Sequence, residues 1–166
     1  MGGKKVLLVG SGGREHALAK KISESPELGK LYIAPGNAGT ALVGENIPIK
    51  ATDIQSLKSF ALLNKIDLTV VGQDDPLAEG IVDLFTSYRL RIFGPRQSAA
   101  QIEASKVFAK RFMIDVGIPT AKFMVFKKTD YELASQFVRS RLNPARNIRN
   151  VRAPSLLWRA GRRKHH

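Results

Sequence analysis

Cysteine is absent from this chain of 166 residues, and long apolar runs and a signal-peptide pattern are absent too. Without cysteine there are no disulfides, no thiolate zinc sites and no thiol nucleophile. The apolar run at residues 6–9 falls far short of the roughly 18 residues that a membrane-spanning helix needs. No basic start, long apolar stretch and small-residue cleavage site mark an exported protein. We therefore expect a soluble cytoplasmic protein with no membrane partner.

Acidic residues are missing from the last 28 positions, which carry nine of the 27 Lys and Arg. Residues 1–138 carry the other 18 together with all 14 Asp and Glu, so most of the formal charge of +13 belongs to the C-terminal stretch. Blocks of like charge are usually disordered, and this stretch also lacks clear periodicity. We predict a disordered basic tail over residues 145–166 and no nucleic-acid partner for the folded body. A nucleic-acid-binding arm, with salt-sensitive binding, is the alternative.

Apolar runs of strand length alternate with helical spacing over residues 4–103. Strands are expected at residues 4–9, 31–33, 47–49, 66–71 and 90–93, and helices at 14–23, 54–63, 74–85 and 97–103. Such alternation predicts an α/β fold, in which a parallel sheet carries helices on both faces. The apolar content of 43% is sufficient to bury a core.

The pattern changes near residue 104. A helix over residues 106–116 with Ser105 as its cap is followed by a strand-like run at 123–126 and another helix at 130–138. These elements resemble the opening of a second domain. We expect three parts, namely a first domain over residues 1–103, the start of a second over 104–144, and the tail over 145–166.

A glycine-rich turn follows the first strand, in the place where phosphate-binding turns lie. It contains Gly10, Ser11, Gly12, Gly13 and Arg14. Glycines allow a ligand to approach backbone N–H groups, a helix N-terminus favours anions, and Arg14 offers charge-assisted hydrogen bonds. The dinucleotide fingerprint is incomplete because Glu15 stands where its third glycine belongs. The residues fit a monophosphate better than NAD, and a tight turn without a ligand is the alternative.

Two further loops follow strands of the same predicted sheet. The second loop contains Pro35, Gly36, Asn37, Ala38, Gly39 and Thr40. Ligands of open α/β sheets bind outside the carboxyl ends of the strands, and Asn37 and Thr40 offer groups for sugar hydroxyls. In the third loop, Asp74 and Asp75 suit an amine or ribose hydroxyls. Plain connecting turns and a helix cap are the alternative interpretations of these two loops. We find no catalytic triad, HExxH motif, Walker A motif or metal-binding carboxylate pair, so we assign no catalytic and no metal-binding residue.

These loops and several later motifs together resemble phosphoribosylamine–glycine ligases of the ATP-grasp superfamily. The resembling segments are Gly10–His16, Ala34–Thr40, Asp67–Gly72, Asp75–Leu77, Phe93–Pro95, Ser105–Lys110 and Gly117–Thr120. They occur in the family's order and extend over about residues 4–144. The resemblance implies a Rossmann-like, pre-ATP-grasp domain, followed by an incomplete start of an ATP-grasp domain.

The resemblance also implies a reaction of purine biosynthesis, in which ATP, 5-phosphoribosylamine and glycine give glycinamide ribonucleotide, ADP and phosphate. Phosphoribosylamine would face Gly10, Ser11, Gly12, Gly13, Arg14, Pro35, Gly36, Asn37, Ala38, Gly39, Thr40 and Asp74. Lys106 would bind a phosphate of ATP, a role that suits a movable point charge; an exposed helix residue is the alternative. The whole enzyme would use ATP with Mg²⁺ or Mn²⁺ and act as a monomer.

The chain departs from the family pattern at two places. Gly72, Gln73 and Asp74 stand where the family has Gly-Pro-Glu, and the basic tail replaces a glycine-rich loop that would cover ATP. Phosphoryl transfer depends on positioning and on metal ions that neutralise charge. We therefore expect a truncated, inactive fragment that binds neither ATP nor metal stably. A stand-alone module that binds a phosphosugar or nucleotide is the alternative function.

Overall fold

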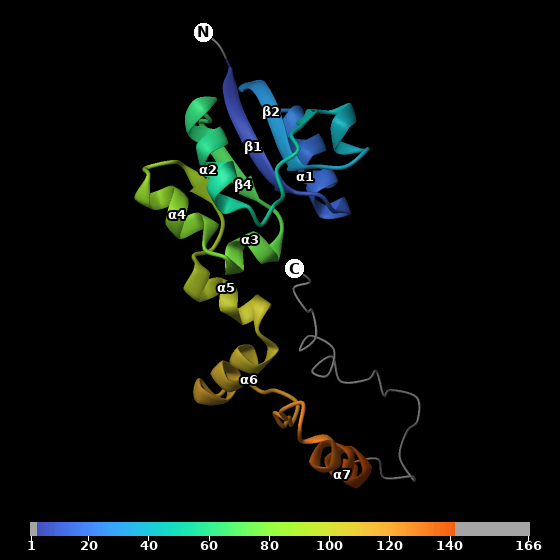
Figure 1. Cartoon of the computed structure of the whole chain (residues 1–166). Coiled ribbons are helices and arrows are strands. Elements are labelled where there is room, and N and C mark those ends of the chain that lie inside the picture. The colour runs from blue at the N-terminus through green and yellow to red at the C-terminus, as the bar shows by residue number, and fades with distance from the viewer. Residues whose placement is uncertain (1–2, 142–166) are drawn as a thin grey trace. The chain divides into compact units, whose positions relative to one another are not determined.

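The computed structural model describes residues 3–141, and the chain divides into two compact units with a boundary between Ala104 and Ser105 (Figure 1). The first unit contains β1 (Lys4–Gly10), α1 (Gly13–Ser23), β2 (Leu28–Pro35), a 3₁₀ turn (Thr40–Leu42), β3 (Glu45–Asn46), α2 (Ile54–Leu63), β4 (Leu68–Val71), α3 (Asp74–Ala78), α4 (Ile81–Ser87), β5 (Ile92–Phe93) and α5 (Gln97–Ala104). The second unit contains α6 (Lys106–Asp115) and α7 (Tyr131–Arg141).

The five strands of the first unit form one parallel sheet in the order β3-β2-β1-β4-β5. In this sheet Gly10 pairs with Pro35, and Val9 pairs with Val71. The strands β1, β2 and β4 therefore end at the same level. The predicted α/β fold with a parallel sheet is confirmed, and the shared level of the strand ends places their following loops side by side.

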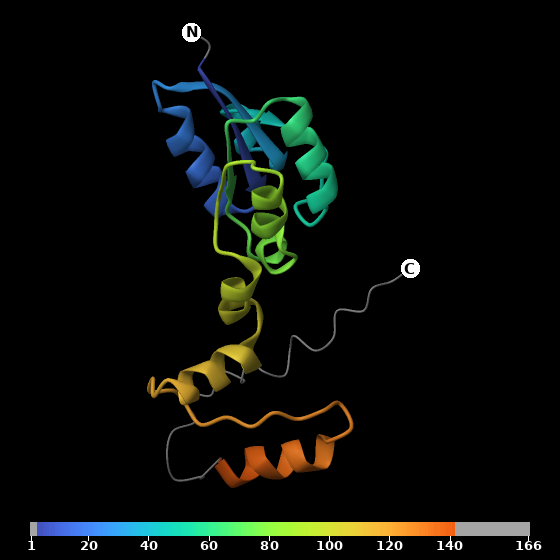
Figure 2. The same cartoon turned by 90° about the vertical axis from the view of Figure 1, so that its left-hand side faces the viewer.

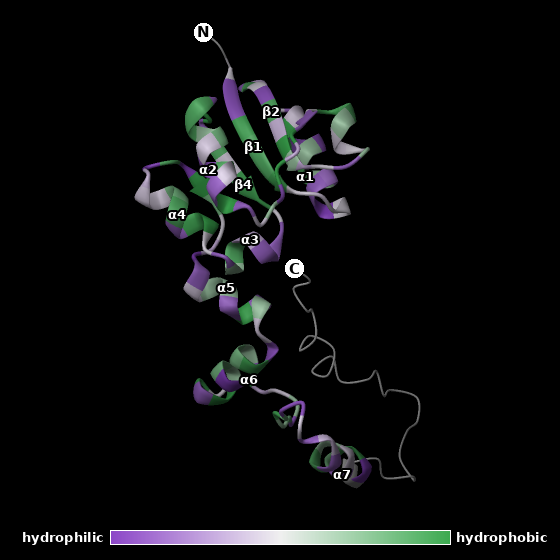
Figure 3. Cartoon of the chain, viewed as in Figure 1, coloured by the Kyte–Doolittle hydropathy of each residue, from purple (hydrophilic) through white to green (hydrophobic). Residues whose placement is uncertain are grey.

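The sheet is covered by α1 on one face and by α2 on the other, as the turned view shows (Figure 2). Helix α4 packs in the same apolar cluster as α2. Successive side chains of β1 alternate between these layers. Val6 and Leu8 pack with Ala19 of α1, whereas Leu7 and Val9 pack in the cluster that contains α2 and α4. The apolar colouring of β1 in Figure 3 reflects this burial on both faces, which favours a continuous apolar run over an alternating one.

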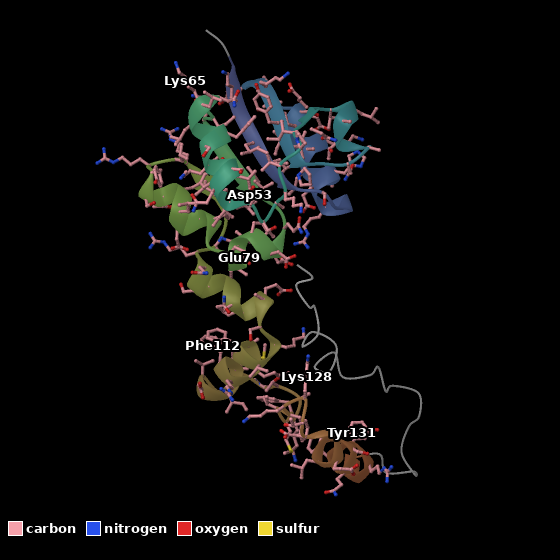
Figure 4. All side chains as sticks on the ribbon, viewed as in Figure 1. Asp53, Lys65, Glu79, Phe112, Lys128 and Tyr131 are labelled. Carbon is pink, nitrogen blue, oxygen red and sulfur yellow. The ribbon has the colours of Figure 1, made fainter. Side chains whose placement is uncertain are left out.

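Helix α2 is fixed at its start by a cap and along its length by packing. The Asp53 side chain accepts a hydrogen bond from the Ser56 backbone N–H at 3.1 Å, and Asp53 is labelled at this end in Figure 4. Leu57 is fully buried beneath the helix, and the Phe60 ring meets Tyr32 of β2 edge-on at 5.2 Å between centroids. These contacts hold the helix against the sheet.

The single helix expected at residues 74–85 is in fact two helices, α3 and α4. Gly80 lies between them with φ of +87°. This left-handed conformation is disfavoured for residues with a Cβ, so the break is set by the glycine. The apolar positions Leu77, Ile81 and Phe85 are nevertheless all buried, which explains why their spacing resembles one continuous helix.

Two of the expected strands are also wrong: one lies elsewhere and the other does not form. The strand predicted at residues 47–49 lies earlier, at Glu45–Asn46, because Pro48 has no N–H to continue the ladder. The run at residues 123–126 forms no strand, since the described part of the second unit offers no neighbouring strand to pair with it. The Phe126 ring instead packs against Phe137 of α7 at 5.7 Å between centroids.

Within residues 3–141, no helix has both the length and the apolar character needed to cross a membrane. The tail predicted at residues 145–166 lies outside the described residues.

Replacing Leu57 tests the layer formed by α2. We expect Leu57→Ala to lower the free energy of unfolding by about 2–5 kcal/mol, because it leaves a cavity at a fully buried site. Leu63→Ala is the matched control on the same helix; its side chain is 83% exposed, and its effect should stay within about 0.5 kcal/mol. Urea unfolding followed by circular dichroism measures both, and equal losses would contradict the assigned helix face.

The cap of α2 predicts a dependence of stability on pH. Hydrogen bonding from the side chain and backbone of Ser56 lowers the pKa of Asp53 below its ordinary value of 3.8. The stabilisation is therefore complete at neutral pH and is lost as the pH falls through the lowered pKa in the folded state. We expect the Asp53→Ala variant to melt at a lower temperature than the parent at pH 7, and this difference to shrink below pH 4. An unchanging difference in melting scans across this range would contradict the cap.

Candidate functional site

Three loops meet at the carboxyl ends of β1, β2 and β4. Backbone hydrogen bonds join the starts of the second and third loops to the end of β1. The Gly36 N–H donates to the Gly10 carbonyl at 3.1 Å, and the Gly72 N–H donates to the Val9 carbonyl at 3.0 Å. This edge of the sheet is where open α/β proteins bind ligands. The structure thus brings together the three loops that the sequence singled out.

The first loop leaves β1 through a sharp turn at Gly10, whose φ is +139°. A residue with a Cβ is strained in this conformation, so glycine is needed at the turn. Gly12 then caps α1, and the stretch from Ser11 to Arg14 is exposed. The loop therefore presents backbone groups and one guanidinium to solvent at the positive end of a helix.

Beneath this exposed stretch lies a buried carboxylate that we did not assign to the site from the sequence. The Glu15 side chain turns back from α1, and its Oε2 accepts a hydrogen bond from the Gly12 N–H at 2.6 Å. Glu15 is only 3% exposed, and its Oε1 has no hydrogen-bond partner among the described residues. The spacing of Gly12 and Glu15, which is that of a capping box, is the sequence signal for this contact.

Glycines on two loops make the room that Glu15 occupies. A Cβ added at Gly10 would collide with the Glu15 side chain, and one added at Gly72 would lie 2.5 Å from Oε1. The carboxylate therefore lies between the first and third loops. Glu15, which the sequence analysis did not assign to the site, thus fills the space between these two loops.

Asn37 fastens the second loop to the first. Its Nδ2 donates to the Ser11 carbonyl at 2.8 Å and to the Gly12 carbonyl at 3.2 Å, while its Oδ1 accepts from the Thr40 N–H at 3.0 Å. The Thr40 side chain is fully buried, and its hydroxyl lies 2.8 Å from Asn46 Oδ1. Of the two polar groups expected to meet sugar hydroxyls, the Asn37 amide joins the two loops and the Thr40 hydroxyl bonds to Asn37 and Asn46. Their contact with a substrate stays a prediction.

Arg14 and Asp74 join the first loop to the third. The guanidinium Nη1 lies 3.5 Å from Asp74 Oδ1, and both side chains are largely open to solvent. An exposed pair of this kind adds little stability, so both groups are free to exchange partners with a ligand. Asp74 is the first residue of α3, but the N-cap of this helix is Gln73, so the alternative interpretation of Asp74 or Asp75 as the helix cap is wrong.

Lys106, the expected ATP lysine, lies in the second unit as the first residue of α6. The Ser105 hydroxyl caps this helix by accepting from the Phe108 N–H at 3.2 Å, and Lys106 itself is exposed. Lys110 of the same helix is engaged instead, since its Nζ donates to the Thr120 hydroxyl at 2.6 Å. A role of Lys106 at ATP stays a prediction.

The described residues do not fit a bound divalent metal ion. Over residues 3–141, no group of three or more His, Asp or Glu side chains is placed to hold one. We therefore assign no step of phosphoryl transfer to these residues.

A family model and the curated relatives of this chain agree on one family. Residues 4–103 match the family model described as phosphoribosylglycinamide synthetase, N domain. Curated phosphoribosylamine–glycine ligases are similar to the chain: that of Caldanaerobacter subterraneus is 49% identical over 140 residues, covering 84% of this chain and 33% of the relative. That of Ralstonia nicotianae is 56% identical over 124 residues, covering 74% of this chain and 29% of the relative.

A solved structure agrees with these matches. The crystal structure of phosphoribosylamine–glycine ligase from Thermotoga maritima has a TM-score of 0.56 and 32% identity, covering 81% of this chain and 30% of that one. The chain thus spans about a third of the length of the relatives it matches. The family model extends over β1 to α5, the elements that carry all three loops, and the chain therefore belongs to the phosphoribosylglycinamide synthetase family through its N domain.

Proposed function

We propose that this chain supplies the phosphoribosylamine-binding part of a phosphoribosylamine–glycine ligase. The whole enzyme would join 5-phosphoribosylamine to glycine at the expense of ATP, and would release glycinamide ribonucleotide, ADP and phosphate. This reaction belongs to purine biosynthesis, and a monomeric enzyme of the cytoplasm is part of the proposal. Identities of 49% and 56% to ligases of that name support it.

The observation that carries the proposal is the joining of three loops at one sheet edge. Asn37 ties the second loop to the first, and Arg14 pairs with Asp74 of the third. A sugar phosphate presents hydroxyls and an anionic group on one small molecule, and this edge offers exposed backbone groups, a guanidinium and a carboxylate. The Arg14 guanidinium would donate charge-assisted hydrogen bonds, and Asp74 would accept hydrogen bonds from hydroxyl or amino groups.

ATP and Mg²⁺ enter this proposal as requirements of the whole enzyme. Lys106 is the described residue that we assign to an ATP phosphate, because it matches the family motif and is exposed at the start of α6. Within residues 3–141, no cluster of acidic side chains is placed to bind the metal ion. The part of the reaction that the described residues support is therefore substrate binding.

A titration with ribose 5-phosphate tests the binding site. We expect amide chemical-shift changes at residues 10–14 and 36–39 with this ligand and none with NAD, whose fingerprint is incomplete here. Arg14→Gln should weaken ribose 5-phosphate binding about tenfold, because it removes a charge-assisted contact. Lys20→Gln, at the far end of the same helix, is the charge-matched control and should bind like the parent.

Two outcomes count against the proposal. Preferential binding of NAD would mean that the turn binds dinucleotides, and shift changes located away from the three loops would place the ligand elsewhere. If binding occurred only through residues 139–166, as a chain shortened at that point would reveal, the nucleic-acid alternative would be favoured instead.

Replacing Asn37 tests the connection between loops. We expect Asn37→Asp to lower the free energy of unfolding by about 1–3 kcal/mol, because it replaces the donors to two carbonyls by an acceptor. It should also move the amide signals of both loops without ligand and weaken ribose 5-phosphate binding. Asn64→Asp is the matched control, since Asn64 donates to the Phe60 carbonyl at the end of α2, away from the loops. Normal binding by Asn37→Asp would show that the connection does not shape the site.

A further inference from the structure

Glu15 occupies the position that decides what the glycine-rich turn binds. In the dinucleotide fingerprint this position carries the third glycine, which allows helix and strand to pack closely. Here a carboxylate fills the space between Gly10, Gly12 and Gly72. Because these three residues are glycines, no Cβ occupies the space that the Glu15 side chain fills.

The carboxylate occupies the Gly12 N–H, so this donor is not available to a ligand at the turn. It lies at the N-terminus of α1, where a bound phosphate would find both free donors and the positive end of the helix. Glu15 Oε2 already accepts this N–H at 2.6 Å, a short distance typical of a charge-assisted bond. A ligand phosphate at the same N–H would have to displace a buried side chain.

Charge opposes a phosphate at this place as well. Glu15 Oε1 has no hydrogen-bond donor among the described residues, and the carboxylate adds a negative charge beside the turn. Two anions about 4 Å apart repel each other strongly away from bulk water.

We propose that Glu15 is the specificity-determining residue of this turn, with its carboxylate occupying the Gly12 amide and excluding phosphate from it. At the helix N-terminus where dinucleotide-binding proteins bind the pyrophosphate of their ligand, this chain places the carboxylate of its own Glu15. For the proposed substrate this keeps the phosphate off the Gly12 amide and leaves that part of the turn to the hydroxyl or amino groups of the ribose. That orientation rests on the proposed function, whereas the exclusion of phosphate does not.

Inorganic pyrophosphate is the probe, because it carries the paired phosphates of a dinucleotide and no sugar. Its binding to the full chain is followed through the amide signals of Gly12 and Gly13. We expect Glu15→Gln to bind pyrophosphate at this turn at least about tenfold more tightly than the parent, because the repelling charge is gone. Glu24→Gln, which removes an exposed carboxylate at the other end of α1, should behave like the parent.

Glu15→Asp separates charge from packing. It keeps the negative charge beside the turn, although its shorter side chain no longer reaches the Gly12 N–H, so it should bind pyrophosphate more weakly than Glu15→Gln does. If Glu15→Asp gained as much affinity as Glu15→Gln, a loosened turn rather than charge would be responsible, and the proposal would be wrong. Equal affinity of Glu15→Gln and the parent would overturn it too.

A measurement on the parent protein keeps the test independent of how the variants fold. The side-chain carboxyl carbon of Glu15 is observed together with the Gly12 amide during the same titration. We expect both signals to stay in place with pyrophosphate, and saturable joint movement of both would contradict the proposal. Failure of ribose 5-phosphate to bind would count against the proposed function alone, since this titration uses no sugar.

Discussion

Burial of β1 on both faces is the constraint on which the first unit depends. Its neighbours β2 and β4 bond to both of its edges, while α1 covers one face and the apolar cluster of α2 and α4 covers the other. Such a strand has no side exposed to water, and its apolar side chains have no alternative place to go. The helices are held largely because they cover this strand and those beside it.

The site follows from this packing because the strands are in register. Once Gly10 lies beside Pro35 and Val9 beside Val71, the loops that follow must start next to one another. Their polar groups then bond across the gaps, as Asn37 does to two carbonyls. Side chains that appear in the sequence as separate candidates become one hydrogen-bonded unit. Parts of this unit serve the architecture, since Thr40 is buried and bonded within it.

The sequence was sufficient for the elements whose signals are local. The apolar run of β1, the helix at residues 54–63 and the glycine-rich turn all lie in the structure where the pattern indicated. The break at Gly80 was missed because Leu77, Ile81 and Phe85 keep helical spacing across two helices. The run at residues 123–126 has strand composition, but pairing depends on a neighbour that composition does not reveal. Glu15 was missed as a site residue because its role depends on space left by Gly72, far away in the sequence.

The fit of Glu15 between glycines of two loops makes those positions epistatic. A methyl group at Gly72 would meet Oε1 at 2.5 Å, so its cost depends on whether residue 15 carries a long side chain. Shortening that side chain would relieve the collision but would leave the Gly12 N–H without its acceptor. Whether a substitution is tolerated in the third loop therefore depends on the residue present in the first, and the reverse also holds. The turn and the end of β4 can change only as a pair, which ties the ligand chemistry of one loop to the backbone of another.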